Sequence, residues 1–297
     1  MTIEGILPVI PTPFRDGRFD RKSFQQMLDH MLPSVDGYTL LGSTGEAPSL
    51  STEQRIEIAE FALETTPRDK TVVVGVTNTS ATDGRRLAVH AQEHGAAGVL
   101  CAVPFYFTNS VGGIRRYLAE LDEVLEIELV LYDNPAATKT QLRSEQVIGY
   151  AGEFERLNTV KLTDHDLTKV ATWQSAGLRV LGGDDPILFR YLDAGVDGVM
   201  VIAPVLFPEA FRRVWDLMRA GKRQAALGLF ASELLATLHV FGIGDEIATS
   251  KTLLVQMGVF DSDEVLPPLE MTDAARRSLL QTALDVSLDA QAQAASR

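Results

Sequence analysis

The feature that most constrains the fold of this 297-residue chain is a regular alternation of short apolar segments with helix-like segments. The eight segments predicted as strands are residues 5–14, 37–44, 71–77, 98–105, 128–135, 159–164, 179–185 and 198–205. Continuous apolar runs such as Val72-Val73-Val74 indicate strands covered on both faces, which is typical of parallel strands joined by helical crossovers. Eight such units predict an α/β fold, namely a closed (β/α)₈ TIM barrel.

The segments between the predicted strands carry helix-start signals. Ser51 is followed three residues later by Gln54, which is the pattern of a capping box. The alternative fold, an open doubly wound sheet, would need a glycine-rich phosphate turn after an early strand. The segment 42–46, Gly-Ser-Thr-Gly-Glu, does not match that fingerprint. We therefore favour the barrel.

After the eighth strand the pattern becomes helical and stays so, over residues 208–220, 223–240, 246–257 and 272–290. This is more than one closing helix. We expect a barrel that carries the active site over residues 1–221 and a C-terminal helical appendage over residues 222–297, of a kind that often serves in oligomer contacts. Residues 291–297 are expected to form a frayed tail.

Composition restricts the functions that we consider. No stretch approaches the roughly 20 uninterrupted apolar residues of a membrane span, so we expect a soluble protein without a membrane partner. Residues 1–4 lack the pattern of a signal peptide, and the single Cys101 cannot form an intramolecular disulfide, so we expect a cytoplasmic location. A net charge of −13 repels phosphate backbones, and we expect no nucleic-acid partner.

Lys161 is the strongest candidate for chemistry. It lies in the β-branched run Thr159-Val160-Lys161-Leu162-Thr163, where an amine is normally out of place. An amine held in an apolar interior loses hydration of its charged form, so its pKa falls from about 10.4 toward neutrality and it becomes a usable nucleophile. That chemistry is typical of Schiff-base enzymes. The alternative is a lysine that snorkels at a strand end.

Tyr132 is predicted to lie on the strand next to that of Lys161. Period-two alternation places Tyr132 with Val130 and Asn134, so an inward Lys161 implies an inward Tyr132. A phenol beside an amine and a carbonyl carbon can shuttle protons during formation of a carbinolamine and during carbon–carbon bond cleavage. The alternative is an aromatic side chain that only packs in a strand.

The segment 42–46 ends the second predicted strand. Gly42 and Gly45 allow the backbone to approach a ligand, and the amides and hydroxyls of Ser43 and Thr44 form a cradle for a carboxylate. Glu46 is expected to pin this loop rather than to react. Taken alone, such a cluster can also be only a turn.

Two further groups of residues could belong to the site, namely the histidines and a pair of adjacent acids. His165 follows the sixth strand and shares the face of Lys161 if the extended conformation continues, so we assign it a substrate-binding role. Gly182-Gly183-Asp184-Asp185 is read as a turn that begins the next helix rather than as a metal site. The remaining histidines are expected to be surface or packing residues; they are His30, His90, His94 and His239.

The chain resembles the dihydrodipicolinate synthase / N-acetylneuraminate lyase family of class I aldolases, through the barrel and into the C-terminal helices. The motifs that carry the resemblance, in this order and at these separations, are Pro11-Thr12-Pro13-Phe14, Gly42-Ser43-Thr44-Gly45-Glu46, Pro104-Phe105-Tyr106, Tyr132-Asp133-Asn134-Pro135, Lys161 and Gly182-Gly183-Asp184-Asp185. Each motif by itself is only modest evidence for the resemblance, whereas the whole set in this order is highly specific for the family.

The resemblance implies roles for individual residues. Lys161 corresponds to the Schiff-base lysine and Tyr132 to the proton shuttle, and Ser43 and Thr44 would hold the carboxylate of a 2-oxo acid such as pyruvate. No metal and no cofactor would take part.

The resemblance also implies an assembly, a homotetramer built as a dimer of dimers. In it Tyr106 would work across a tight dimer interface and complete a Tyr132–Ser43–Tyr106 proton relay. Met200 would line the pocket, and Gly183 would contribute to substrate binding.

Departures from the family pattern bear on the second substrate, an aldehyde. The synthases carry an arginine for the aldehyde's carboxylate where this chain has Ala137, and loss of that bidentate contact removes a few kcal/mol. Thr163-Asp164-His165-Asp166 replaces small residues, and Asp133 replaces an asparagine. Such a polar, anionic rim around the site suits an aldehyde with a hydroxylated carbon chain better than one with a second carboxylate.

We therefore expect a pyruvate-dependent lyase that cleaves or forms a 2-keto-3-deoxy sugar acid. The alternatives, in order, are 4-hydroxy-tetrahydrodipicolinate synthase of lysine biosynthesis and a dehydratase or deaminase of a related 2-oxo acid. A non-enzymatic 2-oxo-acid sensor is the alternative from another class.

Overall fold

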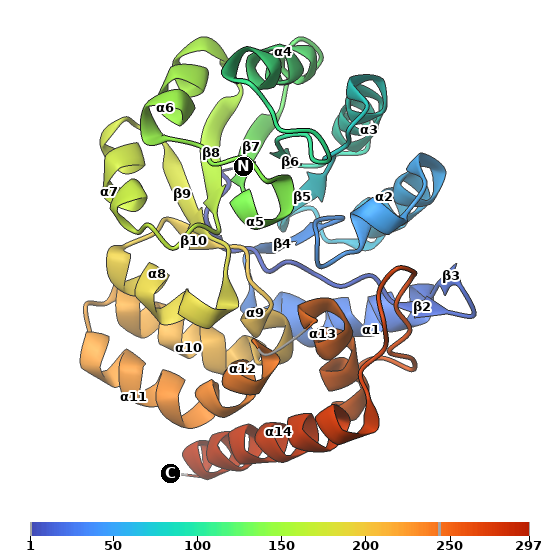
Figure 1. Cartoon of the computed structure of the whole chain (residues 1–297). Coiled ribbons are helices and arrows are strands. Elements are labelled where there is room, and N and C mark those ends of the chain that lie inside the picture. Colours follow the sequence, from blue (N-terminus) through green and yellow to red (C-terminus); the bar gives the residue numbers. More distant parts are fainter. Residues whose placement is uncertain (1, 243–244, 297) are drawn as a thin grey trace.

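A computed structural model describes residues 2–242 and 245–296, and its centre is a barrel of eight parallel strands (Figure 1). The strands are β1 Gly5–Ile6, β4 Gly37–Leu40, β5 Thr71–Gly75, β6 Gly98–Ala102, β7 Glu128–Asp133, β8 Leu157–Leu162, β9 Arg179–Gly182 and β10 Gly198–Val199. They are ordered β1-β10-β9-β8-β7-β6-β5-β4. A parallel bridge from Val9 to Thr39 joins the two ends of this order, so the predicted barrel is confirmed.

Most strands are shorter than the predicted runs, because the last residues of each run belong to the loops at the carboxyl end. The largest difference concerns the first run, 5–14. Strand β1 ends at Ile6, and Phe14 begins a separate two-stranded hairpin of β2 (Phe14–Arg15) and β3 (Arg18–Phe19). The hairpin turns at Asp16 and Gly17, which both have positive φ.

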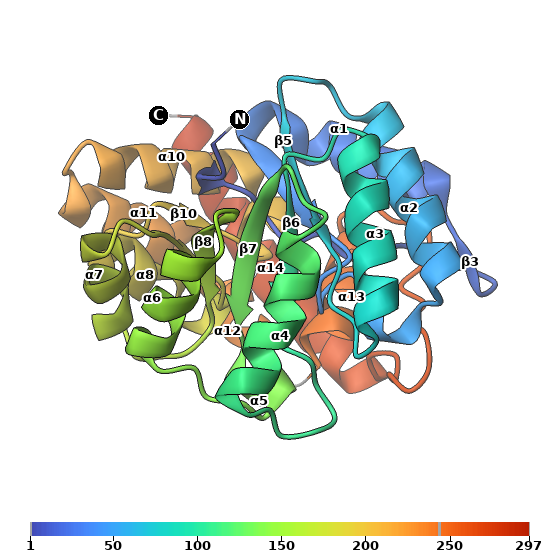
Figure 2. The ribbon, with the colours of Figure 1, turned by 90° about the horizontal axis from the view of Figure 1, so that it is seen from above.

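Helices cover the outside of the strands (Figures 1 and 2). The longer ones are α1 Arg21–Met31, α2 Thr52–Thr65, α3 Ala81–Glu93, α4 Val111–Asp122, α6 Ser144–Glu153, α7 Thr168–Ser175, α8 Leu188–Ala194 and α10 Pro208–Arg219. Short turns of helix lie in the loops: η1 Leu32–Ser34, η2 Ala47–Ser49, α5 Pro135–Thr138, η3 Asp185–Ile187 and α9 Ala203–Leu206. The predicted capping box of Ser51 and Gln54 begins α2.

Four further helices form the predicted C-terminal appendage, drawn in orange to red in the lower half of Figure 1. They are α11 Arg223–Glu233, α12 Leu235–Phe241, α13 Glu246–Gln256 and α14 Ala274–Ala295. The expectation of a frayed tail is wrong for residues 291–295, because α14 packs on α11 and α12 and Gln291 donates a hydrogen bond to the carbonyl of Glu233. Arg297 lies outside the described residues.

Within the described ranges, no helix by itself has the length and hydrophobicity needed to cross a membrane; α11 and α12 pass that test only together, across a bend of 63°.

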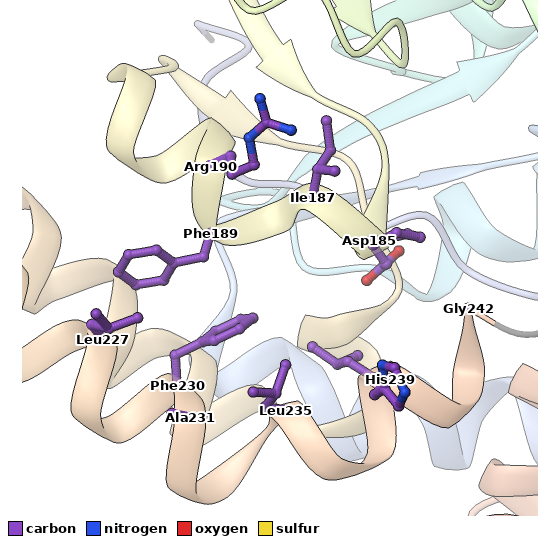
Figure 3. A pocket seen from close by; sticks show the side chains of 12 residues that line it. Asp185, Ile187, Phe189, Arg190, Leu227, Phe230, Ala231, Leu235, His239 and Gly242 are labelled. Atoms are coloured by element: carbon purple, nitrogen blue, oxygen red, sulfur yellow. The ribbon is translucent and has the colours of Figure 1, made fainter.

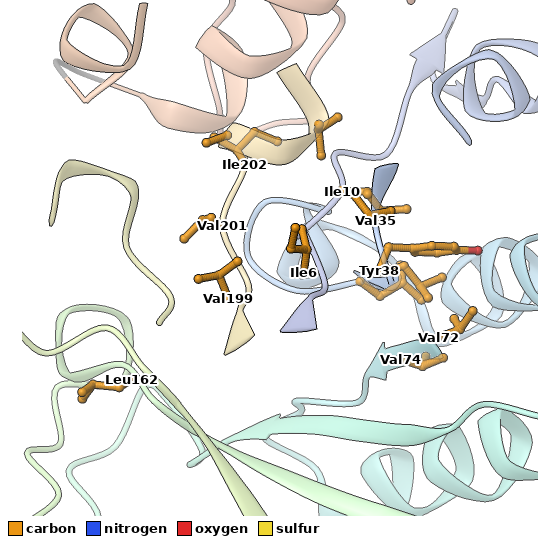
Figure 4. Packing of buried hydrophobic residues seen from close by; sticks show 14 of the residues in the cluster. Ile6, Ile10, Val35, Tyr38, Val72, Val74, Leu162, Val199, Val201 and Ile202 are labelled. Carbon is orange, nitrogen blue, oxygen red and sulfur yellow. The ribbon is translucent and has the colours of Figure 1, made fainter. Parts of the chain in front are cut away.

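Two hydrophobic clusters follow the alternation of side chains along the strands. The larger lies between the strands and the helices and includes Val160 and Leu162; Figure 4 shows part of it, with Ile6, Tyr38 and Val74. The smaller fills the barrel interior and is made of Ile3, Leu7, Val9, Val73, Leu100, Ala102, Val130, Tyr132, Leu181 and Met200. Because Val160 and Leu162 face the helices, Lys161 between them faces the interior.

Candidate active site

Lys161 and Tyr132 lie side by side inside the barrel. They are paired in the register of β7 and β8, and the Lys161 Nζ lies 4.2 Å from the centroid of the Tyr132 ring. Only 4% of Lys161 is exposed, and Tyr132 is also buried. The sequence-based expectation that both side chains point inward from neighbouring strands is confirmed.

Both side chains line a cavity of about 300 Å³ at the carboxyl ends of the strands. Of the predicted site residues, the cavity brings together Lys161, Tyr132, Ser43, Thr44, Gly183 and His165. Its other lining residues are Val9, Asn134, Pro135, Ala136, Thr163, Asp184, Asp185, Ile202, Phe241 and Glu246. Reactive side chains at the carboxyl ends of barrel strands are where this fold places active sites.

Tyr132 lines both this cavity and a second, smaller one, and its hydroxyl is held by Asn134. Asn134 Nδ2 donates a hydrogen bond of 2.9 Å to it, while Asn134 Oδ1 accepts one from the Ala137 amide at the start of α5. The smaller cavity, about 170 Å³, is lined by Tyr132 and Asn134 and also by Gly42, Ser43 and Ala137. Asn134 therefore orients the phenol. Strand alternation had placed Asn134 on the same face as Tyr132 but had not predicted this role.

Three predicted site residues, Met200, Gly45 and Tyr106, line neither of these two cavities. Met200 is fully buried in the interior cluster and packs beneath the site, so the prediction that it lines the pocket is wrong. Gly45 lies outside both linings as well. A Cβ there would approach the Leu41 nitrogen to 2.9 Å, and the Gly45 carbonyl accepts a hydrogen bond from Thr12 Oγ1. Gly45 thus allows the loop to fold closely on itself rather than to contact a ligand.

Tyr106 lies outside the cavity of its own chain. It is 78% exposed, has a φ of 84°, and forms an edge-to-face pair with Phe107 at 5.0 Å between ring centroids. A non-glycine residue with this φ is strained, and such strain is common at functional positions.

The loop that carries Ser43 and Thr44 is fixed by a buried ion pair. Glu46, with a φ of 58°, pairs with Lys251 of α13, and neither side chain has any exposed surface. Glu46 also accepts a hydrogen bond of 2.7 Å from the Leu266 amide, and Lys251 Nζ donates one of 2.7 Å to the Glu264 carbonyl. Burial lowers the pKa of Lys251, whereas Glu46 opposes that change. Glu46 pins the loop as expected, through a partner far along the chain.

One wall of the cavity is acidic. His165 lies past the end of β8, and its Nε2 is 2.7 Å from Asp184 Oδ2. Burial raises the pKa of Asp185 to about 7, although the amides of Ile202 and Ala203 donate hydrogen bonds to its carboxylate.

Glu246 adds a further carboxylate to this wall. Desolvation raises its pKa, and the negative charge of Asp184 raises it further. Sequence reasoning missed Glu246 because it begins α13, 85 residues after Lys161, and no local pattern links the two.

Asp133 and Asp164 do not belong to this acidic wall, contrary to the sequence-based interpretation. Both accept hydrogen bonds from Lys169 Nζ, at 2.8 and 2.7 Å. Burial raises the pKa of Asp133, and the lysine opposes the rise. Burial would lower the pKa of Lys169, but the two carboxylates hold it above its ordinary value. Asp166 instead accepts hydrogen bonds from Thr168 at the start of α7.

A larger cavity, about 450 Å³, lies outside the barrel between α8 and the helices α11 and α12 (Figure 3). Apolar side chains such as Phe189 and Phe230 line most of it, with Arg190 and His239 among the polar ones. Asp185 lines both this cavity and the one at the barrel mouth. The barrel-mouth cavity is the candidate active site, because its lining includes the amine and the phenol.

Comparisons with known proteins agree with this geometry. The model of the "Dihydrodipicolinate synthetase family" matches residues 2–286. A 4-hydroxy-tetrahydrodipicolinate synthase from Methanococcus maripaludis is 26% identical over 285 residues, covering 95% of this chain and 98% of that one. One from Pelobacter propionicus is 27% identical over 280 residues, covering 93% and 96%.

Solved structures show the same barrel. YagE of E. coli K12, a member of the dihydrodipicolinic acid synthase family in complex with pyruvate, is 28% identical with a TM-score of 0.90 and covers 96% of this chain and 98% of that one. The 4-hydroxy-tetrahydrodipicolinate synthase of Methylacidiphilum fumariolicum SolV is 25% identical with a TM-score of 0.92 and covers 98% of each chain.

Barrel, site and matches together define a lyase of the class I aldolase type. More particularly, the chain belongs to the dihydrodipicolinate synthetase family.

Proposed function

We propose that the protein cleaves a 2-keto-3-deoxy sugar acid into pyruvate and an aldehyde, through a Schiff base on Lys161. The observation that carries this proposal is a buried amine beside a phenol, in a cavity with acidic side chains from two other elements. Pyruvate bound to the related YagE supports a 2-oxo acid as the common substrate unit.

The reaction uses Lys161 as nucleophile. Its amine attacks the C2 carbonyl of the keto-deoxy acid, and the carbinolamine loses its hydroxyl as water to give a protonated imine. Removal of the proton from the C4 hydroxyl then breaks the C3–C4 bond, and the bonding electron pair moves onto C3 as an enamine. The aldehyde leaves, a proton adds at C3, and water hydrolyses the imine to release pyruvate and the free amine.

Tyr132 is assigned the proton transfers, because its ring lies against the Lys161 Nζ and its hydroxyl is held by Asn134. Ser43 and Thr44 would bind the pyruvyl carboxylate with their hydroxyls and amides, with Gly42 and Gly183 leaving room beside it. Tyr106 of a partner subunit would extend the proton relay through Ser43, in a homotetramer.

The acidic wall supports a hydroxylated second fragment. Carboxylates accept hydrogen bonds from hydroxyls, whereas a second carboxylate on the aldehyde would be repelled by Asp184 and Glu246. Among the described residues, none of those lining the cavity is an arginine, and the relevant loop presents Ala136 and Ala137.

The second candidate is 4-hydroxy-tetrahydrodipicolinate synthase, the activity after which the curated relatives are named. In that case pyruvate, held as the enamine on Lys161, would add to aspartate semialdehyde. A dehydratase or deaminase of a related 2-oxo acid would use the same imine.

The imine is tested by reduction with borohydride in the presence of pyruvate. We expect the intact mass to rise by one reduced pyruvyl group, located at Lys161 by peptide mapping. Lys161→Arg should abolish labelling, and the exposed Lys22→Arg should label like the wild type. A wild-type protein that binds pyruvate but stays unlabelled would instead be a sensor.

The second substrate is tested by measuring pyruvate release from a panel of keto-deoxy sugar acids, beside condensation of pyruvate with aspartate semialdehyde. We expect the sugar acids to be turned over with the higher kcat/KM. Efficient condensation with the semialdehyde, and none with the sugar acids, would establish the synthase instead.

A further inference from the structure

Glu60 of α2, His90 of α3 and His94, the residue that caps the C-terminal end of α3, form a cluster on the outside of the barrel, away from the candidate active site. The two helices lie side by side in Figures 1 and 2. We propose that these three side chains bind one divalent transition-metal ion of the Zn²⁺ class and thereby join α2 to α3.

The spacing of the ligand atoms suits such an ion. The three atoms all lie within 4.8 Å of one another. Glu60 Oε1 is 3.1 Å from His90 Nε2 and 3.7 Å from His94 Nε2. With metal–ligand bonds of about 2.0–2.1 Å, the ligands of a tetrahedral ion lie about 3.3 Å apart, so small side-chain movements complete the site.

The helix geometry brings the imidazoles together. His90 lies in the last turn of α3, and His94, four residues later, caps the end of this helix with its amide still bonded to the His90 carbonyl. Both rings therefore lie on one side of the helix end, where they stack with centroids 4.0 Å apart. Two histidines at this spacing on one helix face are a recurrent zinc-binding pattern.

The tautomer of His94 also fits metal binding. Its Nδ1 is 2.8 Å from the His90 carbonyl oxygen, which can only accept a hydrogen bond, so Nδ1 carries the proton. The Nε2 of the neutral ring therefore offers a lone pair toward Glu60. A backbone carbonyl that fixes the free nitrogen of a metal-binding imidazole is a common arrangement.

Neighbouring cations do not oppose the ion, because they are already paired. Arg86 lies 3.0 Å from Glu53, and Arg85 contacts Glu120 and Glu123. Two nitrogens and one carboxylate oxygen suit Zn²⁺, Co²⁺, Ni²⁺ or Cu²⁺ better than Mg²⁺ or Ca²⁺. Three protein ligands leave a fourth position for water.

The test is Zn²⁺ binding to the full chain with any affinity tag removed, followed by calorimetry and by metal analysis after desalting. We expect one tightly bound Zn²⁺ per chain and a higher melting temperature with the ion present. His94→Ala and Glu60→Gln should each raise the Kd for Zn²⁺ by about tenfold or more. Glu64→Gln, which removes the same charge one turn further along α2, should bind like the wild type.

Metal bound elsewhere is distinguished by the double variant His90→Ala/His94→Ala. It should lose this Zn²⁺ while still forming the borohydride-reduced pyruvyl adduct, which also shows that it is folded. Undiminished Zn²⁺ binding in this variant, or no binding by the wild type at micromolar Zn²⁺, would overturn the proposal.

Discussion

Two buried lysines eight residues apart, Lys161 and Lys169, have different surroundings. The difference distinguishes a lysine that supports the fold from the one proposed to react. Lys169 donates hydrogen bonds to Asp133, to Asp164 and to the Leu142 carbonyl. Among the described residues, none forms an ion pair with Lys161, which faces a phenol ring and a cavity. Lys169 is thereby fixed as a cation in the wall, whereas Lys161 keeps its amine free for a substrate.

Lys169→Met should destabilise the protein by about 3–5 kcal/mol at pH 7, because it leaves the buried carboxylate of Asp133 without a partner. The penalty should shrink at pH 5, since the pKa of Asp133 is raised by burial and an unpaired carboxyl takes up a proton more readily. Urea unfolding of both proteins at the two pH values measures this. An equal penalty at both would contradict it.

In the wild type, the ion-paired group of Lys169, Asp133 and Asp164 should limit the stability of the fold at both low and high pH. Burial would raise the pKa of Asp164, but Lys169, the Asp166 amide and Gln141 together lower it in the folded state. The contribution of Asp164 to stability therefore exists above the unfolded pKa and disappears as pH falls through the folded one. The pKa of Lys169 is raised, so its contribution exists below the unfolded pKa and disappears as pH rises through the folded one.

Gly183→Ala should damage turnover more than stability. A Cβ at this position would lie 2.6 Å from Lys161 Cε and 2.9 Å from Thr163 Cγ2, so the Lys161 side chain must move. A displacement of about 1 Å at a reacting group costs about 10²-fold in rate. Steady-state kinetics and the melting temperature are the measurements. Gly149→Ala, at a helical site with open space around it, is the matched control and should behave like the wild type.

At the scale of elements, the sequence predicted what local patterns encode. The eight strands, their parallel order and the inward faces of Lys161 and Tyr132 follow from alternation and from apolar runs. The sequence did not predict contacts made by the C-terminal helices. From α13, Glu246 lines the cavity and Lys251 pairs with Glu46, and no spacing rule connects a residue of α13 with a loop near residue 46.

The tie between this loop and α13 gives a prediction for substrate binding. Lys251→Met should cost about 3–5 kcal/mol in stability, because Glu46 then stays buried and unpaired. The KM for the 2-oxo acid should rise by about tenfold, or about 1.4 kcal/mol, as Ser43 and Thr44 lose their fixed position. Glu46→Gln/Lys251→Met, which removes both charges, should recover much of the stability. A loss of stability with unchanged KM would show that the pair supports only the fold.

At the scale of the whole molecule, one segment exposes more apolar surface than a single chain explains. Tyr106 and Phe107 are 78% and 74% exposed, and Val111 nearby is 49% exposed. Apolar patches of this kind mark sites of association. We propose that this segment forms the dimer contact and that Tyr106 enters the site of the neighbouring subunit.

Mixing of two impaired variants tests this arrangement. Tyr106→Phe should lower kcat by about 10²-fold, the usual scale for a proton-transfer group, and Lys161→Ala should be inactive. Hybrid oligomers of the two should regain activity, because a site with an intact lysine then receives a tyrosine from the other chain. Light scattering coupled to gel filtration checks that hybrids form. Hybrids without recovery would show that Tyr106 does not act in the site of the neighbouring subunit.

Phe241 and Glu246 line part of the cavity that contains Lys161. Both follow Lys161 by eighty residues or more in the sequence. In the proposed reaction, the residues that would form the imine and those that would contact the aldehyde are therefore encoded in separate stretches of the gene. We therefore expect substitutions near the start of α13 to change which aldehyde is accepted and to leave imine formation at Lys161 unchanged.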